Sequence, residues 1–236
     1  MSALFLPADY TRIRLVDSFE ELVNSPFADG INALCWQREL AGDFSEILRH
    51  IKIEEGITTL DEASLASLCL SADGMIALAG IFRDLHALRD AGLDPVLDCV
   101  NGYLRDDNGG PIPTDVYSFH ADSSPIETDT YLCTYHGAAS EGLRNDQALR
   151  KVDICEVRAE LLESFGGSDG AVFREHLSEC CYDLHYAPLG AAQPFSFGVG
   201  NLWRIAVDYP NSPVPPCIHR APQTQPGDPP RLLLIS

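Results

Sequence analysis

The stretch Val116-Tyr-Ser-Phe-His120, followed by Ala121 and Asp122, alternates between polar and apolar side chains. A period of two predicts a β-strand with one buried face, because successive side chains of a strand point to opposite faces. His120 and Asp122 then leave the strand on the same face, and Ala121 points away. The sequence therefore predicts an imidazole and a carboxylate side by side on one face of a sheet.

Further strand-like runs surround this stretch, from residue 94 to the C-terminus. Many short strands separated by turn residues, such as those of 106–111, are typical of a β-sandwich or a jelly-roll barrel. Eight of the 16 prolines lie between Pro210 and Pro230; because proline cannot donate to a strand ladder, we expect rim loops there. The expected strands are Val96–Leu104, Thr130–His136, Lys151–Val157, Pro194–Phe197, Leu202–Asp208, Cys217–His219 and Arg231–Ile235.

Residues 1–93 mostly show helical spacing, with apolar residues every three or four positions and Ser18 as a candidate N-cap. The expected helices are Phe19–Val23, Phe44–Ile53, Leu60–Cys69, Met75–Leu88 and, between later strands, Arg158–Phe165 and Gly170–Cys181. We therefore expect an α+β fold in a single domain, 1–236. Its helical residues 1–93 would support a jelly-roll core formed by residues 94–236.

The formal net charge of −19 bears on the partners of the protein. Nucleic-acid backbones and anionic membranes bind clusters of lysine and arginine, so we expect neither partner. No run approaches the ~20 apolar residues of a membrane-spanning helix, and the N-terminus lacks the basic and apolar segments of a secretory signal. We expect a cytoplasmic protein whose eight cysteines are buried thiols rather than disulfides.

A second histidine and an arginine follow His120 and Asp122 later in the chain. His219 ends the run Cys217-Ile-His219, about a hundred residues after His120, and Arg231 comes 12 positions later in the last strand-like segment. Two imidazoles and one carboxylate can cap one face of a ferrous ion and leave the opposite face free, as in non-haem iron oxygenases. The candidate metal ligands are therefore His120, Asp122 and His219.

These residues resemble the motif of the Fe(II)/2-oxoglutarate-dependent dioxygenases: His-x-Asp, a distal His, then an Arg ten to fourteen positions later. The resemblance covers residues 95–236 and implies a double-stranded β-helix (a jelly-roll) with N-terminal buttressing helices. It further implies that Fe(II) is held by His120, Asp122 and His219, and that Arg231 anchors the co-substrate 2-oxoglutarate. The implied activity is the hydroxylation or other oxidation of a small molecule by dioxygen, with release of succinate and CO2.

Two details of the motif affect the expected site. The family often has Ser or Thr two residues after the arginine, where this chain has Leu233, so we expect a hydroxyl from Tyr117, Tyr131 or Thr134 to assist Arg231. Arg220 directly follows His219, and strand alternation predicts that it points outward. The carboxylate of Asp122 favours hydroxylation or desaturation, because relatives that halogenate lack it.

Other interpretations of the same residues stay open. A jelly-roll binding protein without redox chemistry, or another mononuclear iron or zinc enzyme that does not use 2-oxoglutarate, would retain the same scaffold. In a purely structural interpretation, His120 is a buried histidine paired with Asp122, and His219 is a loop residue in a proline-rich turn.

Two further motifs in the sequence could indicate a different function. Residues 166–170 match the G-x-S-x-G string of α/β-hydrolases, but the preceding run is helical, which favours a helix ended by glycine. The run His176–His185 holds two histidines and two cysteines that hint at zinc; a helix end with packed thiols is the simpler interpretation.

Overall fold

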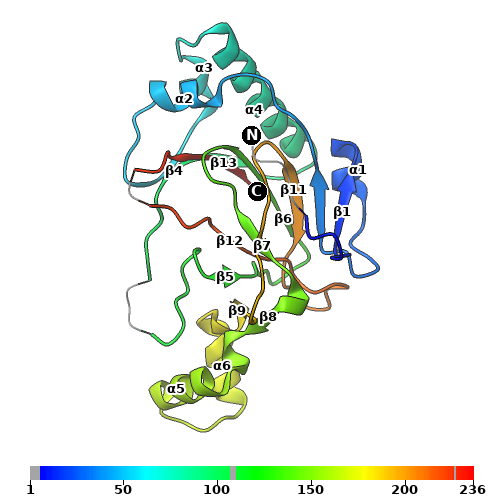
Figure 1. Ribbon diagram of the computed structural model, residues 1–236, viewed down its shortest axis with the longest axis vertical. Coiled ribbons are helices and arrows are strands. Elements are labelled where there is room, and N and C mark those ends of the chain that lie inside the picture. Colours follow the sequence, from blue (N-terminus) through cyan, green and yellow to red (C-terminus); the bar gives the residue numbers. More distant parts are fainter. Residues whose placement is uncertain (1–5, 107–109, 226) are drawn as a thin grey trace.

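The computed structural model describes residues 6–106, 110–225 and 227–236. Within these residues, two β-sheets form the centre of a mixed α+β fold (Figure 1). The larger sheet has seven strands in the order β1-β2-β11-β6-β13-β4-β3, and the smaller has six in the order β10-β7-β12-β5-β9-β8. The larger sheet comprises β1 (Ile13–Val16), β2 (Ala33–Trp36), β3 (Gly56–Thr59), β4 (Val96–Asn101), β6 (Asp129–His136), β11 (Leu202–Ala206) and β13 (Arg231–Ile235). The smaller sheet comprises β5 (Phe119–His120), β7 (Glu141–Leu143), β8 (Ala148–Arg150), β9 (His185–Pro188), β10 (Phe195–Ser196) and β12 (Ile218–Arg220).

The helices before β4 have N-termini capped by Ser18, Asp43, Asp61 and Ser71, whose side-chain oxygens accept backbone N–H bonds. They are α1 (Phe19–Asn24), α2 (Phe44–His50), α3 (Glu62–Ala66) and α4 (Ala72–Asp90). In Figure 1, α2, α3 and α4 lie at one end of the molecule, beside the larger sheet. Side chains of α2 and α4 form one buried cluster with Tyr131, Cys133 and Tyr135 of β6, so the helices cover one face of that sheet.

The opposite face of the larger sheet packs against the smaller one. Leu132 of β6 and Trp203 of β11 share a buried cluster with Phe195 of β10 and with Phe197. The rings of Phe197 and Trp203 are stacked, with centroids 4.4 Å apart, and the Trp203 indole N–H donates to the Phe197 carbonyl at 2.7 Å. Alternation along β6 therefore sends odd-numbered side chains to the helices and even-numbered ones between the sheets.

The helices α5 (Cys155–Phe165) and α6 (Ala171–Glu179) lie at the far end of the molecule from α4 (Figure 1). They have an apolar cluster of their own, which includes Leu161, Phe173 and Ile112. Gly166 ends α5 with a left-handed φ of 72°, the conformation that favours glycine at a helix end. The strand that a hydrolase nucleophile turn needs before residue 166 is thus replaced by a helix.

The expected helices are confirmed within a few residues, but three expectations for the strands are wrong. Of the expected strand Val116–His120, only Phe119–His120 forms a strand, whereas Val116 and Tyr117 lie in a turn. Residues 151–157 form a short 3-10 helix (Lys151–Asp153) and the start of α5 instead of a strand. Residues 1–93 also hold β1, β2 and β3, so the larger sheet takes strands from both sides of residue 93. Strands of four residues are too short for a period to separate strand from helix.

The structure also tests the expectations for the cysteines and for membrane-spanning helices. All eight cysteines are free, and four of them are buried, namely Cys35, Cys99, Cys133 and Cys217. Cys69, Cys155 and Cys181 are exposed, so the expectation of buried thiols holds for only part of the set. Within the described residues, none of the helices has the length and apolar character needed to cross a bilayer.

Candidate metal centre

His120 and His219 lie opposite each other on neighbouring strands. β5 and β12 are antiparallel, and the two histidines form the register pair between them. Directly opposed residues share a face of the sheet, and the two imidazole centroids are 4.6 Å apart. The pairing of two very short strands thus brings together side chains that are 99 residues apart in the chain.

Asp122 completes a three-residue group. Its Oδ1 lies 3.8 Å from Nε2 of His120 and 3.8 Å from Nε2 of His219. One ligand atom from each residue lies within 4.8 Å of the others, a spacing that a single metal ion can bridge. The three predicted ligands therefore converge, and they are the only such group in the part of the chain that the structure describes.

Neighbouring groups orient all three side chains. Nδ1 of His120 donates to the Ser118 carbonyl at 2.8 Å, and Nδ1 of His219 donates to the Cys217 carbonyl at 3.4 Å. Because a carbonyl only accepts, each Nδ1 carries the proton and each Nε2 keeps a free lone pair. The Thr130 hydroxyl donates to Oδ2 of Asp122 at 2.6 Å, which leaves Oδ1 facing the imidazoles. Such outer contacts are typical of metal ligands.

The protonation states suit a metal site. Burial, with a smaller effect of His219, lowers the pKa of His120 from 6.5 to about 4, so its ring is neutral at neutral pH. Burial acts to raise the pKa of Asp122, but His219, the Thr130 hydrogen bond and His120 together lower it. A neutral imidazole and a charged carboxylate are the forms that bind metal ions.

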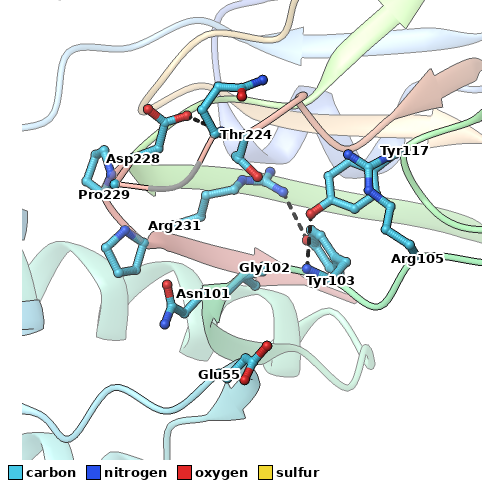
Figure 2. A pocket seen from close by; sticks show the side chains of 14 residues that line it. Glu55, Asn101, Gly102, Tyr103, Arg105, Tyr117, Thr224, Asp228, Pro229 and Arg231 are labelled. Atoms are coloured by element: carbon cyan, nitrogen blue, oxygen red, sulfur yellow. Dashed lines mark hydrogen bonds between the residues drawn. The ribbon is translucent and has the colours of Figure 1, made fainter.

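Arg231 lies at the start of β13 and is 2% exposed. Its Nη1 donates to the Tyr103 hydroxyl at 2.9 Å, and its Nη2 donates to Ser140 Oγ at 3.0 Å and to Thr134 Oγ1 at 3.4 Å. Figure 2 shows the bond to Tyr103. Among the described residues, Nε has no partner and no carboxylate forms an ion pair with this guanidinium. A buried cation held only by neutral groups is costly, which points to an anionic ligand.

Arg231 and Asp122 are tied to the same face of β6. Thr130 binds Asp122 and Thr134 binds Arg231, and four residues of a strand span about 13 Å. A cavity of about 350 Å³ adjoins Arg231 and is lined by Tyr103, Tyr117 and Arg105, among others (Figure 2). The residues that line this cavity include Arg231 but not His120, Asp122 or His219. The hydrogen bonds of Thr130 and Thr134, on one face of β6, connect the arginine to the candidate metal ligands.

The three candidate hydroxyls take different positions. Thr134 contacts Arg231, whereas the Tyr117 hydroxyl accepts from the Tyr103 backbone N–H at 3.1 Å and lines the same cavity. Tyr131 packs in the cluster between the larger sheet and the helices. Its odd position in β6 turns it away from Thr130 and Thr134, so the structure does not place its hydroxyl beside Arg231.

Arg220, the residue after His219, lies on the opposite face of β12. Its guanidinium forms an ion pair with Glu141 at 2.7 Å and lies over the ring of Phe119, 4.2 Å from the centroid. Phe119 belongs to a cluster separate from the one that contains Phe197 and Trp203. Arg220 therefore points away from His219, as strand alternation predicts.

Four residues of this region are not predicted as site residues by the sequence: Thr130, Ser140, Tyr103 and His185. The position of Thr130 could have been recognised, because it opens an alternating run on the same face as Thr134. Ser140 lies outside the expected strands. Tyr103 falls within the expected strand Val96–Leu104, but β4 ends at Asn101, and no local pattern marks either residue as part of a site. In the run His176–His185, His176 packs against Phe165 and Tyr182, whereas His185 lies beside His120 with ring centroids 5.8 Å apart.

Comparisons of the chain with protein-family models, with curated proteins and with solved structures found no match.

Proposed function

We propose that this protein is an Fe(II)- and 2-oxoglutarate-dependent oxygenase that oxidises a small molecule. The observation that carries the proposal is the convergence of His120, Asp122 and His219, with Nε2, Oδ1 and Nε2 turned toward one another, on an interior face shared with the buried Arg231. The two facing sheets are compatible with a double-stranded β-helix, and the proposal retains the expected cytoplasmic compartment.

The donor set fits a ferrous ion. Two neutral imidazoles and one carboxylate on one side of an ion leave its other positions for exogenous ligands. When bound, iron would supply the activation of dioxygen, with electrons from the oxidative decarboxylation of 2-oxoglutarate to succinate and CO2. The chain's own contribution is to hold the donors: the Ser118 and Cys217 carbonyls fix the two rings, and Thr130 fixes the carboxylate.

Arg231 supplies the second half of the proposed site. Its guanidinium has no carboxylate partner among the described residues, and burial lowers its pKa. A dicarboxylate with one end near the candidate metal and the other at Arg231 would neutralise this cation. Tyr103, Ser140 and Thr134 orient the guanidinium from one side and leave Nε for the ligand.

The test is an anaerobic titration of the protein with Fe(II) and 2-oxoglutarate, followed by visible absorption. We expect the charge-transfer band of the iron chelate. Arg231→Leu should weaken 2-oxoglutarate binding at least tenfold while iron affinity stays unchanged. Arg220→Leu is the matched control, because it removes a guanidinium that faces away from the site. Arg231→Lys, which keeps the buried charge, provides a second variant if the leucine variant fails to fold.

Each outcome of the titration indicates a different class of protein. Iron binding without the band would contradict the use of 2-oxoglutarate and favour another mononuclear-metal enzyme. Absence of iron binding would contradict the metal site and favour a binding protein. Unchanged co-substrate affinity in Arg231→Leu would contradict the anchor role.

A further inference from the structure

The two candidate ligand histidines belong to a longer row of nitrogen-bearing side chains on the smaller sheet. His120 pairs with His219 on one side and with His185 on the other. Lys151 directly follows β8, whose last register pair is Arg150 with Tyr186, and so comes next to His185. The opposed histidines share one face, so His219, His120 and His185 form a row across the neighbouring strands β12, β5 and β9. Lys151 begins the 3-10 helix after β8 and lies close enough to His185 to act on its charge.

His185 is a buried histidine whose ring is not fully satisfied. It is 4% exposed, and its Nδ1 is one of the few buried side-chain polar atoms that lack a partner among the described residues. It lies outside the group of three residues that can share one ion. A buried polar atom without a partner is costly, and a ligand that accepts from or donates to Nδ1 would remove that cost.

Lys151 is a partly buried cation held by a neutral group. Its Nζ donates to the Ser118 hydroxyl at 2.7 Å, and within the described ranges no carboxylate forms an ion pair with it. The carboxylate that acts on it, Asp115, accepts from the Tyr117 and Asp106 backbone N–H groups at 3.0 Å each. The neighbouring Arg150, in contrast, is paired with Asp153 at 3.1 Å.

At the His219 end of the row, aromatic side chains fill the space beside the strand. His219 pairs with Gly142, and a Cβ at Gly142 would meet the Phe195 ring at 2.2 Å. Phe197 stacks near His219 with centroids 6.4 Å apart. Aromatic rings therefore lie on the His219 side of the candidate ligands, whereas His185 and Lys151 lie on the His120 side.

We propose that His185 and Lys151 form a subsite for the carboxylate of the small-molecule substrate, beside the metal and separate from the Arg231 anchor. This inference rests on the proposed oxygenase function, because it assigns the substrate class of that site. Two nitrogen donors suit one carboxylate, whose two oxygens can each accept a hydrogen bond. The substrate of this class would be a carboxylic acid, including an amino acid.

Calorimetry on the full chain loaded with Zn(II), which supports no turnover, tests the subsite. The titrants are four acids and their amides: acetate and acetamide, benzoate and benzamide, glycine and glycinamide, leucine and leucinamide. Saturating 2-oxoglutarate fills the Arg231 end throughout. We expect at least one acid to bind at least tenfold more tightly than its amide, and His185→Phe and Lys151→Met each to remove that preference without changing Zn(II) affinity.

Arg150→Met is the matched control, since it removes a neighbouring cation that already has a carboxylate partner. The inference is overturned if no acid is preferred over its amide, or if both subsite variants bind like the wild type. It is also overturned if Arg231→Leu, rather than His185→Phe, removes the preference. Acid preference without the iron–2-oxoglutarate band would contradict the proposed function alone, and the band without acid preference would contradict the subsite alone.

Discussion

Two threonines on one strand connect the larger sheet to the two halves of the candidate site. Thr130 donates to Asp122, and Thr134 accepts from Arg231. Both have even positions in β6, whose odd positions pack against the helices. A rigid strand in the middle of the larger sheet thus sets the separation between the candidate metal and the proposed co-substrate anchor.

Thr130→Val should lower metal affinity by about 10–100-fold, the usual cost of losing an outer contact to a ligand. The valine has the same shape but does not donate to Oδ2 of Asp122, so the carboxylate loses its orientation. The pKa of Asp122 also rises, because this hydrogen bond helps to lower it. Competition for Zn(II) against a chelating dye at pH 7 measures the effect.

Thr134→Val is the control for Thr130→Val, because it makes the same change on the same face of β6 at the Arg231 end. We expect it to leave Zn(II) affinity at the wild-type value. Thr130→Ser, which retains the hydroxyl, should lose far less affinity than the valine variant. Equal affinities in Thr130→Val and wild type would show that the hydroxyl does not orient the ligand.

At the scale of elements, the position of β12 depends on its neighbour β7. Gly142 of β7 pairs with His219 of β12 on one side and with Phe195 of β10 on the other. The Phe195 ring fills the space above this glycine. A residue without a side chain is therefore needed where an aromatic ring crosses the strand next to a candidate ligand.

Gly142→Ala should destabilise the protein by about 1–3 kcal/mol, the typical cost of overpacking a core. The new methyl group would displace the Phe195 ring, which is 5% exposed and has little room to move. Because the same residue pairs with His219, Zn(II) affinity should fall as well. Urea unfolding and metal titration measure the two effects, and Gly142→Ala with Phe195→Leu should recover most of the stability. An alanine variant as stable as the wild type would contradict this packing.

A second connection between elements lies on the helix side. Asp84 of α4 forms an ion pair with Arg38 and accepts from the Tyr135 hydroxyl at 2.7 Å. All three groups are largely buried, so the pair attaches α4 and the segment after β2 to β6. This contact fixes the helices against the sheet on the face opposite the candidate site.

For the whole molecule, burial of histidines makes stability depend on pH. Burial lowers the pKa values of both His120 and His185 from 6.5 to about 4. Between these values the unfolded chain binds more protons than the folded one, so stability falls as the pH drops through this window. One pKa unit corresponds to about 1.4 kcal/mol, and the loss is up to about 3 kcal/mol for each histidine.

Urea unfolding of the metal-free protein at pH 7 and near pH 4.5 measures this loss. His185→Phe should flatten the pH dependence, because the phenylalanine has no proton to gain on unfolding. Tyr186→Phe is the control, because it changes the residue next to His185 in β9 but removes no group that titrates between pH 4.5 and 7; it should leave the slope unchanged. Identical slopes in His185→Phe and wild type would contradict the buried, neutral state of His185.

The sequence by itself determined which residues are candidates and which period each segment follows. Alternation correctly predicted that Arg220 points away from His219, because the two-residue period of a strand is a local property of the backbone. It also predicted that Asp122 lies beside His120, although β5 ends at His120 and Asp122 follows the strand. Helical spacing and glycine ends located α4, α5 and α6 for the same reason. The strands β1, β2, β3, β7, β8 and β9 were not predicted, because three or four residues are too few for a period to be recognised.

The contacts between distant residues depend on how the strands pair in the fold. The pairing of β5 with β12 and β9 brings His219 and His185 to His120, and the start of β13 places Arg231 among Tyr103, Ser140 and Thr134. Strand pairing and burial depend on contacts between segments far apart in the chain, and no local pattern encodes them. That Arg231 and Lys151 have no ionic partner among the described residues likewise depends on which carboxylates the fold brings near them.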